Sequence, residues 1–321
     1  MFDSKIKILL DTDIGVDCDD AGAIAILHTL ADKGEAQILG MTHCYSGKYN
    51  AGCISAINTY YGRPDIPIGV CHKAKEIHDI YARHLAENFT NRYRNNEECE
   101  DAVALTRRLL WESADHDVTY VAIGSLYSLR AVLESEADGI CPLNGEELLK
   151  QKIKRTVIMG GRFKESWPED YVIGGEYVVD AEFNIKADIA ASQIVCERFP
   201  GEIVFCSYEI GWDIITGEGM LKSELHHPVK SAYKKYTGGE RGRESWDLTA
   251  ILYAVRPEAG YWSLHEFGKV TVDDAGVTTW ARDKKSRHTY LLVREKPDKI
   301  REILDHMLET TPKLLAKADY K

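Results

Sequence analysis

The chain of 321 residues contains no hydrophobic run long enough to cross a membrane. A membrane-spanning helix needs about 20 consecutive apolar residues, and every apolar stretch in this sequence is shorter. The N-terminal stretch MFDSKIKILLDTD has only a short apolar segment before its acidic residues, which is not typical of a secretory signal. We therefore expect a cytoplasmic protein that does not enter a membrane.

The eight cysteines contain no C-x-x-C pair, and no histidines accompany them at the spacing of a zinc site. This scattered arrangement argues against both a disulfide framework and a structural zinc site. It is typical of buried thiols in a reducing compartment, which agrees with a cytoplasmic location.

The sequence also lacks an excess of positive charge, because 40 Lys and Arg residues face 51 Asp and Glu residues, for a formal net charge of -11. Nucleic acids and anionic membranes are polyanions, so a protein that binds them needs a basic face. We therefore expect a small molecule as partner, with no nucleic acid and no membrane. The contents of hydrophobic residues (44%) and charged residues (28%) are typical of a folded globular protein.

No Pro-rich or Gly-rich linker, internal repeat or low-complexity tract divides the chain, which favours one domain over residues 1–321. Apolar segments with the spacing of strands and of helices alternate along it. The predicted strands are 5–10, 36–42, 118–123, 153–159 and 202–206, the predicted helices are 21–30, 51–61, 126–134 and 185–198, and 282–288 is a predicted loop between two late strands. This alternation predicts an α/β fold, in which a mostly parallel central sheet has helices on both faces.

Ligands of such sheets bind beyond the carboxyl ends of the strands. We therefore expect chemistry in the segments that follow the predicted strands. These are residues 11–20, 43–49, 124–125 and 160–162.

The segment after the first predicted strand holds five aspartates within ten residues: Asp11, Asp13, Asp17, Asp19 and Asp20. Carboxylates this close raise one another's pKa unless a positive group lies among them, and the segment has no Lys or Arg. A hard cation with oxygen ligands, calcium or magnesium rather than zinc, would balance them. The competing interpretation is that Asp19 caps the next helix and the helix dipole favours the other acids. It explains one or two aspartates better than five.

A D-x-D motif at the end of a first strand is also typical of phosphatases with an aspartate nucleophile, of the haloacid dehalogenase type. In that interpretation Asp273 and Asp274, which follow Val-Thr-Val at 270–272, are the late metal-binding pair. That family usually has Thr or Val at the fifth motif position, where this chain has Gly15. This phosphatase is our second hypothesis.

Asp11-Thr-Asp-Ile-Gly, followed by Asp19-Asp20-Ala21, resembles the N-terminal signature of the inosine-uridine-preferring nucleoside hydrolases, with two extra residues before the Asp pair. Further segments agree with this family in order and spacing. They are GRPDIP at 62–67, VAIGSL at 121–126, MGG at 159–161, EFN at 182–184 and SWD at 245–247. The resemblance covers residues 5 to about 255, and it implies an open Rossmann-like fold and a homodimer or homotetramer.

The resemblance implies that Asp13 and Asp20 bind Ca²⁺ through their side chains, that Ile123 binds it through its backbone carbonyl, and that Asp247 completes the site. All four are oxygen donors, as calcium prefers. It further implies that the ion lowers the pKa of a bound water and that Asp13 takes its proton as general base. The expected activity is the calcium-dependent hydrolysis of the N-glycosidic bond of a ribonucleoside or a close analogue.

The resemblance also implies substrate contacts. Asp19, Glu182 and Asn184 occupy the positions that bind the ribose hydroxyls, and Met159 would pack against the sugar. Glu176 stands where the family more often has an Asn for the 5'-hydroxyl, and its carboxylate would repel a 5'-phosphate. The alternative for 182–184 is a helix start that Asn184 caps, and the alternative for Met159 is packing in the core.

One position departs from the family pattern, because Trp246 stands where many members have a His that protonates the departing base. An indole N–H cannot deliver a proton, although the ring could stack on a nucleobase. His43, Tyr45 and His227 are candidate replacements for the acid. Asp17 is either an additional acid of the outer site or a solvated loop residue.

The missing histidine leaves a third hypothesis open, in which a calcium-loaded pocket binds ribosides without turning them over. The presence of Asp13, the expected base, argues against pure binding. The preferred base or leaving group stays open.

Overall fold

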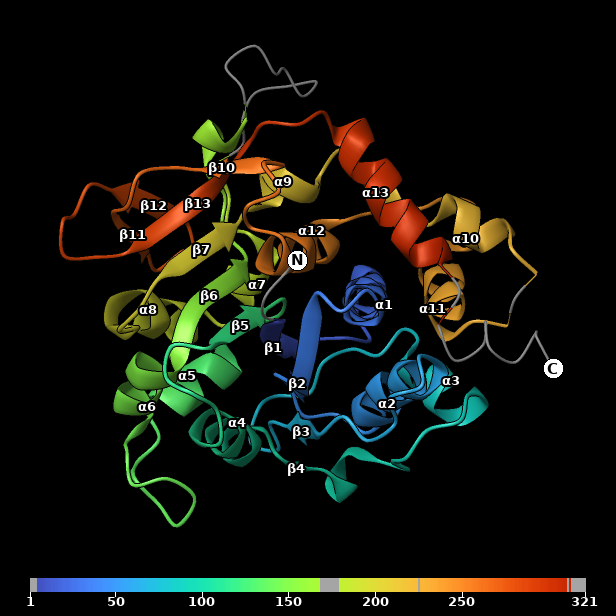
Figure 1. The fold of residues 1–321 in the computed structure, drawn as a ribbon, viewed down its shortest axis with the longest axis horizontal. Coiled ribbons are helices and arrows are strands. Elements are labelled where there is room, and N and C mark those ends of the chain that lie inside the picture. The colour runs from blue at the N-terminus through green and yellow to red at the C-terminus, as the bar shows by residue number, and fades with distance from the viewer. Residues whose placement is uncertain (1–4, 168–178, 225, 311, 313–321) are drawn as a thin grey trace.

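The computed structural model describes residues 5–167, 179–224, 226–310 and 312. Within them, a nine-stranded sheet runs through the molecule between two groups of helices (Figure 1). Its strands in spatial order are β10 (Trp262–Leu264), β13 (His288–Val293), β7 (Ile203–Cys206), β6 (Ile153–Met159), β5 (Val118–Ala122), β1 (Ile6–Thr12), β2 (Ala36–His43), β3 (Ile68–Val70) and β4 (Glu100–Asp101). Only the edge strand β10 pairs antiparallel to its neighbour among these nine. The prediction of a mostly parallel sheet is confirmed.

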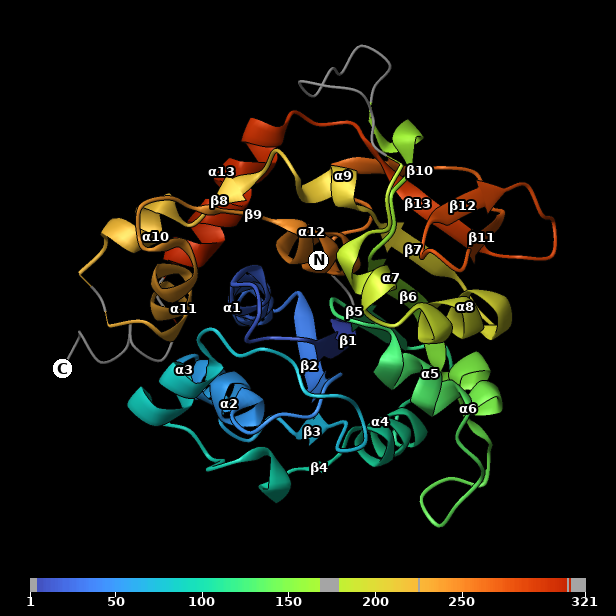
Figure 2. The same ribbon diagram turned by 180° about the vertical axis from the view of Figure 1, so that it is seen from behind.

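Helices cover both faces of this sheet (Figures 1 and 2). One face carries α1 (Asp19–Asp32), α2 (Asn50–Tyr60), α3 (Ala82–Asn88), α11 (Pro228–Thr237), α12 (Trp246–Val255) and α13 (Pro297–Glu309), with α10 (Glu218–Lys222) beside α11 and α13. The other face carries α4 (Ala102–Trp111), α5 (Tyr127–Leu133), α6 (Gly145–Lys152) and α8 (Ile189–Arg198). Each group of helices encloses its own apolar core against the sheet.

The remaining elements are short. They are the helices α7 (Phe183–Ala187) and α9 (Tyr208–Gly211), the 3₁₀ turns Asn96–Glu98 and Lys164–Ser166, and the antiparallel pairs β8 (Ile215–Thr216) with β9 (Arg243–Glu244) and β11 (Lys269–Val272) with β12 (Thr278–Ala281). Both α7 and α9 lie near the carboxyl ends of β6 and β7, the edge of the sheet where a ligand is expected.

The first strand shows why the sequence folds this way. Ile8, Leu9 and Leu10 are all fully buried, and Ile8 and Leu10 belong to one core while Leu9 belongs to the other. Successive side chains of a strand point to opposite faces, so a strand covered by helices on both sides needs a continuous apolar run.

The predicted strands and helices begin and end within two residues of the observed ones, except the helix predicted over 185–198. That segment forms α7 and α8, which are separated at Asp188 (φ -148°, ψ 84°). The Asp188 side chain accepts a hydrogen bond from Ala191 N and caps α8. The predicted loop joins β12 to β13, with His288 already in the strand.

The order of the strands fixes the place of the site. The chain passes from β1 through β2 and β3 to β4, and then returns to β5 on the other side of β1. Such a change of direction opens a crevice at the carboxyl ends of the two strands, here β1 and β5. Above β1, the helices α1 and α12 pack against each other, so the N-terminal turns of two distant helices meet near this crevice.

No described helix is both long and apolar enough to cross a membrane. All eight cysteines are buried and free of disulfide bonds, as expected from their spacing. Burial raises the pKa of the Cys18 thiol well above its ordinary value, so this thiol stays protonated near the acidic segment.

The packing of α1 against α11 and α12 predicts the effect of substituting Gly22. A Cβ added there would lie 2.5 Å from the Tyr233 hydroxyl oxygen and 3.0 Å from a methyl carbon of Leu248. Alanine normally stabilises a helix relative to glycine by about 1 kcal/mol. We expect Gly22→Ala instead to lower the free energy of unfolding by about 1–3 kcal/mol, because α1 is overpacked.

Urea denaturation measures this difference. Gly139→Ala is the matched control, because no heavy atom lies within 4 Å of a Cβ at Gly139. If both substitutions change the free energy of unfolding equally, α1 can shift to accommodate the added methyl group and is not overpacked.

Candidate active site

A cavity of about 430 Å³ opens at the carboxyl ends of β1, β5 and β6. The described residues that line it are Asp13, Val16, Asp17, Asp19, Asp20, Ile123, Met159, Arg162, Ala181, Glu182, Phe183, Asn184, Lys186, Tyr208, Tyr236, Arg243, Trp246 and Asp247. All of the predicted site residues that the structure describes lie in this cavity, and Glu176 lies outside the described residues. The structure therefore brings these residues together, while their individual roles stay predictions.

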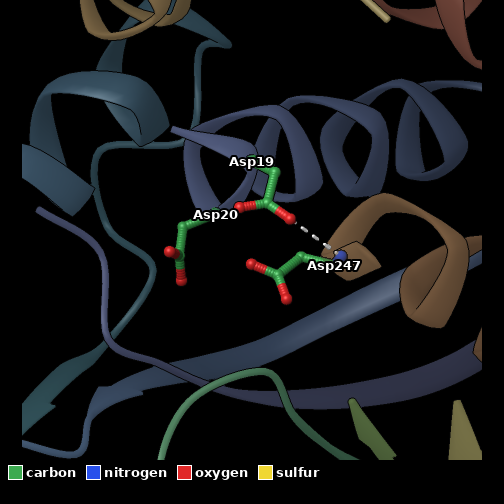
Figure 3. Close-up of side chains that lie close together, drawn as sticks. All are labelled: Asp19, Asp20 and Asp247. Atoms are coloured by element: carbon green, nitrogen blue, oxygen red, sulfur yellow. Dashed lines mark hydrogen bonds between the residues drawn. The ribbon is translucent and has the colours of Figure 1, made fainter. Parts of the chain in front are cut away.

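Three buried carboxylates form a compact cluster at the base of the cavity. Asp19 and Asp20 belong to the first turn of α1, and Asp247 belongs to the first turn of α12. One oxygen atom of each lies within 4.8 Å of the others, and the three side chains face a common space (Figure 3). Oxygen ligands lie about 2.3–2.6 Å from a calcium ion, so oxygens at this separation fit around a single cation.

Local contacts hold these carboxylates in place. Asp247 N donates to Asp19 Oδ2 (3.2 Å), which Figure 3 shows as a dashed line. Thr12 Oγ1 donates to Asp20 Oδ1, which ties the end of β1 to α1. The N-cap of α1 is Cys18, with no side-chain cap, so the interpretation of Asp19 as the cap of this helix is wrong.

Asp13 follows β1 and lies against the end of β5. A Cβ added at Gly124 would lie 2.8 Å from the Asp13 backbone nitrogen, so only glycine leaves the room that Asp13 needs. Burial, and then the charge of Asp17, raises the pKa of Asp13 to about 7. The Asp13 carboxyl therefore changes its protonation near neutral pH when no cation is bound.

The pKa values of the other carboxyl groups in the cluster are raised as well. Burial and then the charges of neighbouring carboxylates raise the pKa values of Asp20 and Asp247 well above the ordinary range, and burial raises that of Asp19. Removing a carboxylate from water is costly unless a positive charge replaces the water. The cluster therefore favours either protons or a cation.

Asp17 has a partner that the acidic segment itself does not contain. Arg243 Nε, in β9, donates to Asp17 Oδ1 (2.9 Å), and Tyr236 Oη donates to Asp17 Oδ2 (3.0 Å). The arginine lies 226 residues further along the chain. Asp17 is thus a paired group in the cavity wall rather than a solvated loop residue.

Glu182 and Asn184 connect the ends of three elements. Glu182, rather than Asn184, caps α7, because its carboxylate accepts from Asn184 N (2.9 Å) and Ile185 N (3.1 Å). The Asn184 side-chain amide donates to Ile123 O (3.2 Å) and Met159 O (3.1 Å). A carbonyl oxygen has two lone pairs, so Ile123 O retains one for an ion.

Two aromatic and two cationic side chains form one wall of the cavity, which we call the aromatic wall: Arg162, Tyr208, Trp246 and Arg243. The Tyr208 and Trp246 rings stack with centroids 5.4 Å apart. The guanidinium carbon of Arg162 lies 3.8 Å from the Tyr208 centroid, and that of Arg243 lies 4.8 Å from the Trp246 ring. Trp246 Nε1 donates to Tyr208 O (2.8 Å), so this N–H is already used within the protein.

Sequence comparison identifies the family of this site. The model of the inosine-uridine preferring nucleoside hydrolases matches residues 8–301. The chain belongs to this family. No curated protein sequence matches the chain.

Solved structures of nucleoside hydrolases share its Rossmann-like fold. A plant nucleoside hydrolase, PpNRh1, is 18% identical with a TM-score of 0.68, and the match covers 94% of this chain and 98% of that one. The purine-preferring ribonucleoside hydrolase from Gardnerella vaginalis is 17% identical with a TM-score of 0.69, again over 94% and 98%. The type III effector XopQ, complexed with adenosine diphosphate ribose, is 12% identical with a TM-score of 0.68 over 97% and 95%. At these identities the likeness concerns the fold alone.

The structure places none of the three candidate replacements for the family's histidine acid in the cavity. His43 is fully buried with Nδ1 2.8 Å from Tyr45 O, and burial lowers its pKa to about 4. His227 Nδ1 accepts from Val229 N (3.0 Å) and caps α11. Tyr45 is buried as well. No histidine is among the described residues of the cavity lining.

The geometry also opposes the phosphatase hypothesis. Asp11 would be the nucleophile, yet it is fully buried, accepts from Ser128 Oγ (2.8 Å) and does not line the cavity. Asp273 lies between β11 and β12, where its carboxylate accepts from Ala275 N and Val277 N. A nucleophile must reach its substrate, so this hypothesis is not supported.

Some residues of the cavity were not predicted from sequence. Arg162 lies in a segment that was expected to carry chemistry, and Tyr208 follows β7, so the rule for strand ends points to both. Tyr236 and Arg243 lie far from any predicted strand end and carry no comparable signal.

The buried carboxyl groups predict how stability depends on pH. Asp13 and Glu182, whose pKa values burial raises from 3.8 and 4.5 to about 7, bind protons more tightly in the folded than in the unfolded chain. These two groups therefore stabilise the folded chain at low pH, and this stabilisation is lost as the pH rises from about 4 to 7. A pKa difference of about one between the folded and the unfolded chain corresponds to about 1.4 kcal/mol of unfolding free energy. In a chelator, we expect a lower melting temperature at pH 8 than at pH 5.5.

Calcium should reverse this trend, because a cation replaces the protons. Thermal unfolding with and without calcium at both pH values measures the effect, and we expect calcium to stabilise much more strongly at pH 8. A melting temperature in chelator that is equal or higher at pH 8 would contradict this view of the cluster.

Proposed function

We propose that this protein hydrolyses the N-glycosidic bond of a ribonucleoside or a nucleoside-like riboside in a calcium-dependent reaction that yields free base and ribose. The observation that carries the proposal is the cluster of Asp19, Asp20 and Asp247 from α1 and α12, in one cavity with Asp13, which follows β1, in a chain of the nucleoside hydrolase family. Asp13 is not part of the group whose oxygens lie within 4.8 Å of one another. The cavity volume of about 430 Å³ lies within the usual range of small-molecule sites, about 300–1,000 Å³.

The proposed calcium ligands are carboxylate oxygens of Asp13, Asp20 and Asp247 and the backbone carbonyl of Ile123, all of which line the cavity. The donor set is entirely oxygen, and it requires a positive charge to be stable as anions. Calcium accepts six to eight oxygen ligands in a flexible arrangement, so it suits a site assembled from a strand end, a loop and two helices. When bound, the ion would polarise the attacking water and lower its pKa.

Asp13 is the proposed general base. Its carboxylate takes a proton from water, whose oxygen then forms a bond to the anomeric carbon. As that bond forms, the bond from the anomeric carbon to the base breaks, and its electron pair goes to the departing base.

The sugar would lie against the opposite side of the cavity. We propose that Asp19, Glu182 and Asn184 bind the ribose hydroxyls, that Met159 packs against the ring, and that Glu176 contacts the 5'-hydroxyl. The carboxylates of this group also favour the positive charge that develops on the sugar in the transition state. The proposed stacking of Trp246 on a nucleobase completes the site.

A second candidate function is the binding of a riboside without turnover. It is favoured by two observations: Trp246 uses its N–H within the protein, and no histidine lines the described part of the cavity. An effector of the same fold, XopQ, has been solved with adenosine diphosphate ribose. Asp13 remains in the cavity, which favours catalysis.

We further propose a cytoplasmic homodimer or homotetramer that acts in nucleoside metabolism such as purine salvage. Eight free, buried cysteines support a reducing compartment. We also propose that residues 1–321 form one domain, because the central sheet contains both β1 and β13, from opposite ends of the described chain. The net charge of -11 supports a small-molecule substrate rather than nucleic acid.

The role of Asp13 predicts the result of its substitution. In Asp13→Asn the general base is lost, so we expect kcat to fall at least about 100-fold. Release of reducing sugar from a panel of purine and pyrimidine ribonucleosides measures activity, and a chelator should abolish it in the unsubstituted protein. Turnover that persists in Asp13→Asn would remove Asp13 from the mechanism, and calcium-dependent binding without any turnover would favour the second function.

The ligand set predicts which aspartates control calcium affinity. We expect Asp20→Asn and Asp247→Asn each to weaken calcium binding at least about 10-fold, because each removes one anionic ligand. Calorimetric titration with calcium measures the affinity. Asp274→Asn is the matched control, because Asp274 is exposed beyond β11 and is a metal ligand only in the phosphatase hypothesis. An unchanged affinity in both cavity variants would show that calcium binds elsewhere.

A further inference from the structure

Arg162 is a cation in the cavity wall that forms no salt bridge with a described carboxylate, although its charge lowers the pKa of Glu182, against the larger effect of burial. It lines the cavity, its Nε atom is buried without a hydrogen-bond partner, and no described Asp or Glu forms a salt bridge with it. Arg243, the other arginine of the wall, pairs with both Asp17 and Glu244. A buried donor without a partner is unfavourable, so Arg162 has a physical reason to bind an acceptor in the cavity.

Hydrogen bonds to Thr278 fix the backbone of Arg162, and its guanidinium contacts an aromatic ring. Its backbone N–H donates to Thr278 Oγ1 (3.0 Å), and the same hydroxyl donates back to Arg162 O (3.1 Å). Its guanidinium lies over the Tyr208 ring at 3.8 Å. A guanidinium stacked on an aromatic ring keeps its N–H edge available for a planar anion such as a carboxylate.

The aromatic wall places this cation on the side of the leaving group. Trp246 directly precedes Asp247 at the start of α12 and stacks on Tyr208, which carries Arg162 on its ring. Trp246 also stands where the family pattern has the acid that protonates the departing base. A fixed cation beside the leaving group favours the negative charge that grows there as the bond breaks, and so lowers the need for that proton.

We propose that Arg162 determines specificity by pairing with a negatively charged leaving group, so that the preferred substrates are ribosides with an acidic aglycone. This inference rests on the proposed function. When the bond to the anomeric carbon breaks, its electron pair goes to the aglycone, so an aglycone that already carries a carboxylate departs with one further negative charge, beside Arg162. Water supplies the oxygen that bonds to the anomeric carbon, and Asp13 takes its proton.

A phosphate on the sugar is another source of negative charge. The Arg162 guanidinium lies over the Tyr208 ring, which stacks on Trp246. We therefore assign the charge to the aglycone, and the experiment includes a 5'-phosphate to separate the two.

The test uses the full chain with calcium and compares substrates that differ only in charge. Uridine-5-carboxylate and uridine-5-carboxamide have nearly the same shape, and uridine 5'-phosphate is compared with uridine. We expect kcat/KM to be at least about 10-fold higher for the carboxylate than for the carboxamide, which corresponds to about 1.4 kcal/mol. In Arg162→Gln this ratio should fall to about one, whereas Arg162→Lys should retain part of it.

Arg282→Gln is the matched control, because Arg282 is 72% exposed and pairs with Glu266. In this variant the ratio of kcat/KM for the carboxylate to kcat/KM for the carboxamide should equal that of the unsubstituted protein. The proposal is overturned if the unsubstituted protein does not prefer the carboxylate, or if Arg162→Gln keeps the preference. The proposal is also overturned if the unsubstituted protein prefers only the 5'-phosphate and Arg162→Gln abolishes that preference. Arg162 would then pair with a phosphate on the sugar rather than with the leaving group.

Failure of the proposed function gives a different result. If none of the four compounds is hydrolysed, calorimetric titration of the carboxylate and the carboxamide measures the same preference in binding. A preference for the carboxylate that is lost in Arg162→Gln supports the role of Arg162 without turnover. Equal binding of the two compounds overturns that role.

Discussion

Burial of closely spaced carboxylates, and then their mutual repulsion, is the constraint on which this site depends. Asp19, Asp20 and Asp247 have oxygens within 4.8 Å of one another, and burial raises their pKa values well above the ordinary range. Such a group is stable only when protonated or when a cation lies within it. Burying these carboxylates close together is unfavourable, and a bound cation would offset that free energy. The folded chain therefore favours cation binding at this place.

The architecture accounts for how these groups are held. The parallel sheet brings the ends of β1 and β5 to one edge, and α1 packs closely on α12, so that acids from opposite parts of the chain meet. Gly22 and Gly124 allow the two close approaches, of helix to helix and of β5 to Asp13. Arg243 neutralises Asp17 at the margin of the cluster, which leaves the inner carboxylates to a cation.

The two sides of the cavity have different chemistry. The side with Glu182 and Asn184 is anionic and hydrogen-bonding, as a sugar requires. The aromatic wall instead presents stacked rings with arginines, and it contains no imidazole among the described residues. The proposed function assigns the metal and the sugar to the carboxylate side and the leaving group to the aromatic wall, so a change in the wall would alter the substrate without altering the proposed reaction.

The sequence by itself determined the alternation of strands and helices, the segment of clustered aspartates and the family, because hydrophobic periodicity and short motifs are local properties of a chain. Only the tertiary structure decided that Arg243 pairs with Asp17 over 226 residues, that Asp19 joins Asp20 and Asp247, and that His43 and His227 do not line the cavity. The break at Asp188 was also missed, because the apolar spacing continues across it. These features arise from contacts between distant segments, and packing of the whole sheet and its helices fixes those contacts.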